Sequence, residues 1–378
     1  MANRKVLRAR TLYDGTGTEP LPDQAIIIEA GRIAAVLPFT DAPEMPILAD
    51  AEIVTPGFID LQINGAGGVL FNDQPDLDGL RIMAQALRKG GTAWFLPTFI
   101  TDFDRRYQLA IATAQVAIDT VPGIVGLHLE GPFLSPLRPG IHPAAAIRKA
   151  EEADFGALCA ADLPLMVTLA PEESGPDGIA RLAQAGVLPF AGHSEASFEQ
   201  VDAARIAGLR GVTHLFNAMS QMTGRAPGLV GATMALEGLF AGIIPDGHHV
   251  HPANIRNAFA TLGPDRLFLV TDAMSPLGTD MTSFTLLGTE IIRDQGRLTG
   301  PGGTLAGADI SMIDCVTRMT TLSGCSLTDA IRMATLTPAR AMRLDGDIGT
   351  IAAGKRAGLT LLDAGLRPQA VCVDGELF

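Results

Sequence analysis

Short apolar runs alternate with longer amphipathic segments along most of the chain. Eight runs rich in β-branched and aromatic residues predict strands at 53–64, 92–100, 123–133, 164–172, 187–194, 211–219, 240–250 and 266–274. Between several of them, apolar residues recur at helical spacing, as in residues 77–91, which end on two glycines. Eight strands with intervening helices predict an α/β fold of the (β/α)8 TIM-barrel type. An open doubly wound sheet is the alternative, and GAGG at 65–68 only weakly matches the phosphate loop that would favour it.

The two ends of the chain share a different pattern. Short strand-like pieces are separated by turn sequences such as DGTG and AGR near the start, and similar pieces return after residue 345. We therefore predict a small β-sandwich domain built from residues 1–51 and 346–378 around a barrel of residues 52–345. In the alternative arrangement, both ends decorate the barrel without forming a domain of their own.

Composition narrows the class of protein. The chain has 378 residues, of which 47% are hydrophobic and 18% charged, so it can bury a large core. Its net charge of −13 argues against binding to nucleic acid or to an anionic membrane. The basic N-terminal residues 1–14 lack the apolar run of a signal peptide, and no segment is long enough to span a bilayer. The four cysteines show no metal-ligand spacing, which favours free thiols and a cytoplasmic location.

Ligand-type side chains stand at the carboxyl ends of five predicted strands, namely Glu130, His193, His214, His249 and Asp272. In a barrel these ends converge on the catalytic face. A glutamate and two histidines suit Zn²⁺ or a similar divalent ion and leave a position for water. A carboxylate such as Asp272 at that face suits a general base, although it could also cap the following helix.

Several strings along the chain resemble the N-acetylglucosamine-6-phosphate deacetylases of the amidohydrolase superfamily. They are PGFIDLQINGAGG (56–68), HLEGPFLS (128–135), GHSEAS (192–197), THLFNAMS (213–220), GLVGA (228–232), DGHHVHP (246–252) and LVTDAM (269–274). The resemblance runs from about Pro56 to the C-terminus. It implies hydrolysis of the acetamide of N-acetyl-D-glucosamine 6-phosphate to D-glucosamine 6-phosphate and acetate, in amino-sugar catabolism.

The first strand departs from the pattern common among amidohydrolases. Many of them carry His-x-His there and hold a second metal, whereas this chain has Gln62 and Asn64. Amide side chains are poor ligands for such an ion beside imidazole. Glu130 also stands where the superfamily has a bridging lysine. We therefore expect one divalent metal per subunit, held by Glu130, His193 and His214. Zn²⁺ is the expected ion, with Fe²⁺, Mn²⁺ and Co²⁺ as alternatives, and no second ion is predicted.

The resemblance also implies roles for individual residues. A hydroxide generated at the metal would attack the acetyl carbonyl, with Asp272 as general base and then general acid, while His142 polarises the carbonyl. The expected substrate-binding positions are Asn217, Ala218, Arg225, His249, Leu305 and Ala306. A homodimer is implied, because in this family the neighbouring subunit can complete the phosphate site. His248 and His251 flank His249 and are not expected to bind metal.

Three rival functions share parts of this pattern. Deacetylation of N-acetylgalactosamine 6-phosphate differs only by the configuration of one hydroxyl. Hydrolysis of cyclic amides is disfavoured, because such sites normally use the first-strand His-x-His. From another class, the chain could be a catalytically inactive, metal-bound binding module, but the complete set of Glu130, His193, His214 and Asp272 counts against this.

Overall fold

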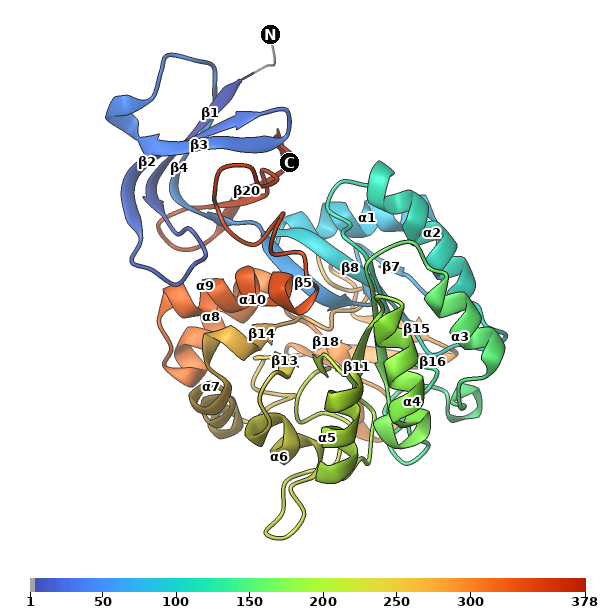
Figure 1. Ribbon diagram of the computed structural model, residues 1–378. Coiled ribbons are helices and arrows are strands. Elements are labelled where there is room, and N and C mark those ends of the chain that lie inside the picture. The colour runs from blue at the N-terminus through green and yellow to red at the C-terminus, as the bar shows by residue number, and fades with distance from the viewer. Residues whose placement is uncertain (1–3) are drawn as a thin grey trace.

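The centre of the molecule is a barrel of eight parallel strands (Figure 1). The computed structural model describes residues 4–378, and residues 1–3 of the predicted first segment lie outside it. The strands pair in chain order and are β5 (Phe58–Ile63), β8 (Thr92–Ile100), β9 (Leu127–Glu130), β10 (Leu165–Leu169), β11 (Leu188–Ala191), β12 (Gly211–Val212), β13 (Phe240–Ile243) and β14 (Leu267–Leu269). Ile63 pairs with Ala273 beyond β14, and the main-chain N–H of Asp272 donates to the oxygen of Gln62 at 2.9 Å. The first and last strands therefore meet, which confirms the barrel and excludes the open sheet.

Helices surround the barrel on the outside (Figure 1). They are α1 (Leu77–Arg88), α2 (Tyr107–Thr120), α3 (Glu152–Cys159), α4 (Pro171–Gln184), α5 (Phe198–Ala207), α6 (Gly228–Ala235), α7 (Pro252–Arg266), α8 (Met312–Ser323), α9 (Leu327–Ala334) and α10 (Leu336–Ala341). Helix α1 begins at a side-chain cap: the side chain of Asp76 accepts from the N–H of Gly79 at 2.8 Å. Its apolar residues Leu80, Met83 and Leu87 share one buried face, so helical spacing in the sequence places the helix against the strands.

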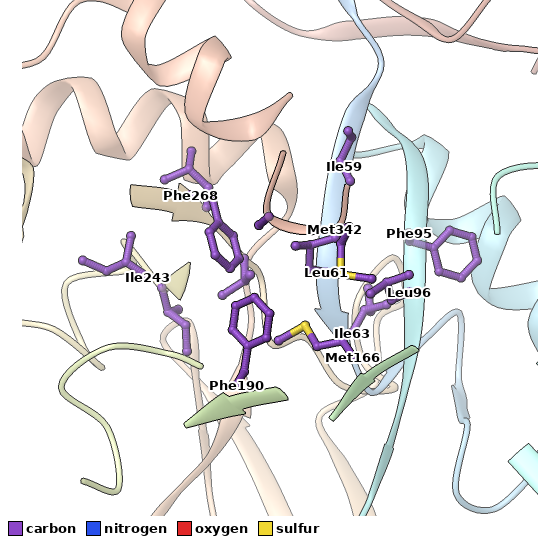
Figure 2. Packing of buried hydrophobic residues seen from close by; sticks show 14 of the residues in the cluster. Ile59, Leu61, Ile63, Phe95, Leu96, Met166, Phe190, Ile243, Phe268 and Met342 are labelled. Carbon is purple, nitrogen blue, oxygen red and sulfur yellow. The ribbon is translucent and has the colours of Figure 1, made fainter. Parts of the chain in front are cut away.

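Aliphatic and aromatic side chains from the strands fill the space inside and around the barrel (Figure 2). Phe190 on β11 and Phe268 on β14 meet edge to face with their ring centres 6.3 Å apart, although β12 and β13 separate these strands in the sheet. Both rings must therefore point into the barrel interior. Such contacts between strands distant in sequence fill the barrel with side chains, so it is a packed core and not a pore. A ligand can therefore bind only at the ends of the strands.

The two chain ends form one seven-stranded sheet beside the barrel (Figure 1). Its strands lie in the order β21 (Glu376–Leu377), β20 (Pro368–Val373), β19 (Leu359–Leu362), β4 (Ile47–Pro56), β1 (Lys5–Leu12), β2 (Leu21–Glu29) and β3 (Arg32–Pro38). Inward side chains of six of these strands share one hydrophobic cluster. The two chain ends therefore form one separate sheet with a hydrophobic core of its own, as predicted for a small β domain built from both ends.

The run at 53–64, predicted as one strand, is divided at Gly57. Residues up to Pro56 belong to β4 of the end sheet, whereas β5 of the barrel begins at Phe58. Between them, the N–H of Gly57 donates to Gly358 at 2.8 Å, and a Cβ at Gly57 would lie 2.3 Å from that of Ala93. Both halves are apolar and form one continuous run, but Pro56-Gly57 is a dipeptide typical of turns and could have indicated the break. The domain division at residues 52 and 345 stays a prediction.

A third sheet, which the sequence pattern did not predict, packs at the mouth of the barrel. This mouth sheet is antiparallel and consists of β15 (Ser283–Leu286), β16 (Thr289–Asp294), β17 (Arg297–Thr299) and β18 (Leu305–Ala308). Its residues Phe284, Ile291 and Leu298 form a cluster with Ile100 and Met274 from the barrel. A short pair, β6 (Gly65–Ala66) and β7 (Val69–Leu70), lies beyond the end of β5. The mouth sheet therefore adds a wall to the catalytic face.

Two remaining expectations concern membranes and thiols. Among residues 4–378, no helix combines the length and apolar character needed to cross a bilayer. All four cysteines are free, and Cys315, Cys325 and Cys372 are buried. Their packing as small apolar side chains is the ordinary role of a buried thiol.

Candidate active site

The strand ends bring the predicted ligand-type residues to one cavity of about 400 Å³. Glu130 is the last residue of β9, and His193 and His214 each stand two residues beyond β11 and β12. His249 and Asp272 follow β13 and β14, and all five residues line the cavity. The volume suits a small molecule such as a monosaccharide derivative.

Glu130, His193 and His214 form a group that could hold a metal ion, with one ligand atom from each lying within 4.8 Å of the others. Glu130 Oε1 lies 3.2 Å from His193 Nε2 and 2.9 Å from His214 Nε2. His193 Nδ1 donates to the main-chain oxygen of Arg138 at 2.9 Å, so a neutral His193 ring points the lone pair of Nε2 at Glu130. Three electron-rich atoms facing one another require a cation between them, and this donor set fits a divalent metal.

The pKa directions of His214 and Glu130 also favour a cation at this position. Burial disfavours a charged ring at His214, but its hydrogen bond to Glu130 and the charges of Glu130 and Asp272 raise its pKa. Burial likewise opposes ionisation of Glu130, yet the adjacent histidine rings bring its pKa well below the usual range. The pocket therefore stabilises an ionised carboxylate together with one positive charge, which a proton supplies when no metal does.

Three of these residues adopt the left-handed backbone conformation that non-glycine residues avoid. The φ angles are 49° at His193, 31° at His214 and 50° at Asp272. Such conformations cost on the order of 1–3 kcal/mol each and persist only where the surrounding structure imposes them. Here each follows a short barrel strand, and the sharp turn directs the side chain across the mouth.

Gln62 and Asn64 hold Asp272 in place. Gln62 Nε2 and Asn64 Nδ2 donate to Asp272 Oδ1 at 3.0 and 2.7 Å, which leaves Oδ2 free for other partners. Gln62 Nε2 also lies 3.3 Å from Glu130 Oε2, between the two carboxylates. Burial and the charge of Glu130 raise the pKa of Asp272 to about 6. The two amides thus act as neutral donors to the acids at the position where a His-x-His pair would bind a metal.

His142 reaches the cavity from the loop that follows β9. Its Nδ1 lies 2.8 Å from Thr101 Oγ1, and Thr101 Oγ1 donates to the main-chain oxygen of Glu130 at 3.1 Å. Burial and the nearby His193 lower the pKa of His142 to about 3, so the ring is neutral. Gly140 lets the loop pass close to His193, because a Cβ at Gly140 would lie 3.0 Å from His193 Cε1.

The structure brings some of the expected substrate-binding residues together and leaves others apart. Asn217, Ala218 and Leu305 line the cavity with His249. Ala306 points the other way and is buried in the hydrophobic cluster of the mouth sheet, because neighbouring residues of β18 face opposite sides. Arg225 lies on an exposed loop and does not line the cavity of its own chain.

His248 and His251, which flank His249, contact residues other than the candidate metal ligands. His248 Nδ1 accepts from Arg297 Nε at 3.1 Å, and the side chain of His251 caps the start of α7. Sequence reasoning missed three residues that support the site: Thr101, Arg138 and Asp246. Thr101 directly follows the strand β8, a position that could have drawn attention, and Asp246 opens the DGHH string. Arg138 acts partly through its main-chain oxygen, which no sequence pattern reveals.

The chain is similar in sequence and in structure to several deacetylases. An N-acetylgalactosamine-6-phosphate deacetylase of Shewanella sp. (strain ANA-3) is 44% identical over 324 residues, 85% of this chain and 82% of that protein. An N-acetylglucosamine-6-phosphate deacetylase of Haemophilus influenzae is 35% identical over 96% of both chains. The crystal structure of N-acetylglucosamine-6-phosphate deacetylase from Pasteurella multocida superposes with a TM-score of 0.94 at 34% identity, covering 99% of both chains. The model of the amidohydrolase family matches residues 53–377, and the chain therefore belongs to that family.

Proposed function

We propose that the chain hydrolyses the acetamide of N-acetyl-D-glucosamine 6-phosphate to D-glucosamine 6-phosphate and acetate. The observation that carries this proposal is the convergence of a metal-binding group, Glu130, His193 and His214, with Asp272 in one cavity. The names of the relatives supply the substrate class. A solved structure from Mycobacterium smegmatis, 33% identical with a TM-score of 0.91, is a variant deacetylase in complex with this acetylated sugar phosphate.

A divalent cation at Glu130, His193 and His214 would polarise the acetyl carbonyl and make the attacking water more acidic. We propose Zn²⁺, because one carboxylate and two imidazoles are a common set for it, while Fe²⁺, Mn²⁺ and Co²⁺ accept the same ligands. Metal analysis of the purified protein distinguishes these ions and counts them per chain.

Asp272 would move the proton. Its Oδ1 is occupied by the amides of Gln62 and Asn64, so Oδ2 is the atom available to accept a proton from the attacking water. As the carbon–nitrogen bond breaks, the same oxygen returns the proton to the departing nitrogen, since an amide anion is too basic to leave. A pKa of about 6 lies close enough to neutrality for both transfers.

His142 would stabilise the charge that develops on the acetyl oxygen. For a neutral ring, donation to that oxygen from Nε2 requires Nδ1 to accept a hydrogen bond. The hydroxyl of Thr101 provides this hydrogen bond when it turns away from the main-chain oxygen of Glu130 and donates to His142 Nδ1. The distance from Thr101 Oγ1 to His142 Nδ1 is 2.8 Å. With its hydroxyl turned in this way, Thr101 stabilises the tautomer of His142 that donates from Nε2.

The phosphate would be bound by His249 and Asn217 from the same chain, with Ala218 and Leu305 beside the sugar. Arg225 would complete the phosphate site only across a subunit contact, because its loop lies outside the cavity of its own chain. We therefore propose a homodimer. Sedimentation at assay concentration tests the oligomeric state directly.

A second candidate is the deacetylation of N-acetyl-D-galactosamine 6-phosphate, which is favoured by the 44% identity to the Shewanella protein of that name. Acetate release from both sugars, each with and without the 6-phosphate, separates these functions when the Zn²⁺-loaded protein is used. Faster turnover of the phosphorylated glucosamine compound supports the proposal, and preference for the galactosamine compound selects the second candidate. No acetate from either phosphorylated sugar, with one metal bound per chain, would contradict both.

A further inference from the structure

Asp246 is a buried carboxylate beside the cavity, and the reaction described above does not use it. It follows β13 at the start of the segment that carries His249, and its side chain is 4% exposed. Its Oδ1 accepts from the main-chain N–H groups of His248 and His249, both at 2.8 Å, and its Oδ2 lies 2.6 Å from His249 Nδ1. One carboxylate thus fixes both the turn and the imidazole ring.

The charge of Asp246 determines which protons His249 carries. Burial favours the neutral acid, but the hydrogen bonds and charge of His249 lower the pKa of Asp246 below its usual value. An ionised carboxylate only accepts hydrogen bonds, so Nδ1 of His249 carries a proton. The opposite nitrogen, Nε2, is left for the cavity that His249 lines.

The partner of Nε2 follows from the chemistry of a phosphate. Phosphate oxygens accept hydrogen bonds, so Nε2 must also carry a proton when it binds one, and the ring is then a cation. Asp246 Oδ2, 2.6 Å from Nδ1, then stays bonded to the opposite side of the ring. Arg138 also lines the cavity, but it forms an ion pair with Glu195, so its charge is already compensated.

Other charged groups hold the segment from outside. Arg318 on α8 donates to the main-chain oxygen of Asp246 at 2.7 Å, and Arg297 on β17 donates to His248 Nδ1. Within residues 4–378, neither arginine forms a hydrogen bond with the His249 ring. Asp272, on the other side, lies close enough for the charge of His249 to lower its pKa. The carboxylate in contact with the His249 ring is therefore Asp246.

We propose that Asp246 is a positioning residue for phosphate recognition, holding the turn and the His249 ring through Nδ1 so that Nε2 donates to the substrate phosphate. This inference rests on the proposed function for the identity of the phosphate. It adds a carboxylate–imidazole pair to the binding site and assigns the DGHH string a physical role.

The variant Asp246→Asn isolates the contribution of the charge. Asparagine Oδ1 still accepts from the two main-chain N–H groups, whereas its Nδ2 is a donor and cannot accept from His249 Nδ1. For the phosphorylated substrate we expect KM to rise by about 10-fold or more, as for loss of a hydrogen bond to a charged group, with kcat changed by less than about 3-fold. KM for the unphosphorylated sugar should stay constant. His249→Gln should have the same effect, and Asp246→Asn should add nothing to it.

A matched control is Asp162→Asn, an exposed aspartate before β10 at the opposite end of the barrel, which should leave both constants unchanged. An unchanged KM in Asp246→Asn would overturn the proposal, and so would equal losses for both sugars. A double variant that shows the sum of two independent losses would overturn it as well.

Ring nitrogen NMR provides a readout that does not depend on turnover. The chain has 7 histidines, so the His249 signals can be assigned from the spectrum of His249→Gln. In the Zn²⁺-loaded parent, Nδ1 of His249 should be protonated, and Asp246→Asn should shift the proton to Nε2. Inorganic phosphate should move the His249 signals of the parent at a lower concentration than those of Asp246→Asn, whose neutral ring keeps a donor at Nε2 but lacks the positive charge. Failure of the parent signals to respond would overturn this inference, whereas absence of deacetylation alone would overturn only the proposed function.

Discussion

Asp154 is a buried anion that ties the loop carrying His142 to the outer helices. Its carboxylate accepts from Arg148 Nη1 and Nη2 at 2.5 and 2.7 Å, from Arg105 Nε at 2.9 Å, and from Tyr107 Oη at 2.7 Å. The main-chain N–H of Glu151 adds a further bond at 2.8 Å. Since the Asp154 side chain is fully buried, its charge depends entirely on these donors.

Asp154→Asn keeps the shape of the side chain and removes its charge. Loss of one partner from a buried ion pair costs about 3–5 kcal/mol. The side chains of Arg105 and Arg148 are 36% and 31% exposed, so water offsets part of the loss, and we expect about 3 kcal/mol. For 378 residues, with an unfolding entropy of about 2 cal/mol/K per residue, this corresponds to about 4 °C in Tm.

The pH dependence tests the reason for the loss. Burial opposes ionisation, but the arginines, Tyr107 and the main-chain donor together hold the pKa of Asp154 well below its usual range. A group with a lowered pKa stabilises the folded state above its unfolded pKa of about 3.9, and loses this contribution as the pH falls further. The difference in Tm between parent and variant should therefore be full at pH 7 and shrink below about pH 4.

Thermal unfolding of parent, Asp154→Asn and the exposed control Asp162→Asn, followed by circular dichroism from pH 7 to about pH 3, measures this difference. A Tm change at neutral pH that is no larger than that of the control would refute the assigned energy. A difference that stays constant down to the lowest pH would show that the cause is packing, not charge.

Three further predictions concern catalysis. Asp272→Asn should keep its metal content and lose about 10²–10⁴-fold in kcat, and steady-state kinetics with metal analysis would reject the role of Asp272 if turnover were retained. Thr101→Val should lower kcat on the order of 10- to 100-fold, because His142 loses the partner of Nδ1; a KM effect alone would contradict this. Arg225→Ala should raise KM for the phosphorylated sugar by about 10-fold or more and spare the unphosphorylated one, whereas equal KM values would remove Arg225 from the phosphate site.

Much of the architecture follows from local pattern. Apolar runs of strand length alternating with amphipathic helices predicted the barrel, because parallel strands need helical crossovers and bury both faces. The same regularity predicted that Glu130, His193 and His214 would meet, since polar residues at the carboxyl ends of barrel strands share one face. The structure places these three side chains together. Their role as ligands, and that of Asp272 as base, remain predictions for the experiments above.

The tertiary structure alone decided features that depend on register and distant contacts. Leu305 faces the cavity and Ala306 the mouth-sheet core, because a shift of one residue along a strand changes its side, and the sequence does not fix that register. The mouth sheet itself arises from packing between segments far apart in the chain. Local composition therefore determined the elements and the location of the chemistry. Which side chains touch was decided by long-range packing, because each such contact depends on where other elements come to lie.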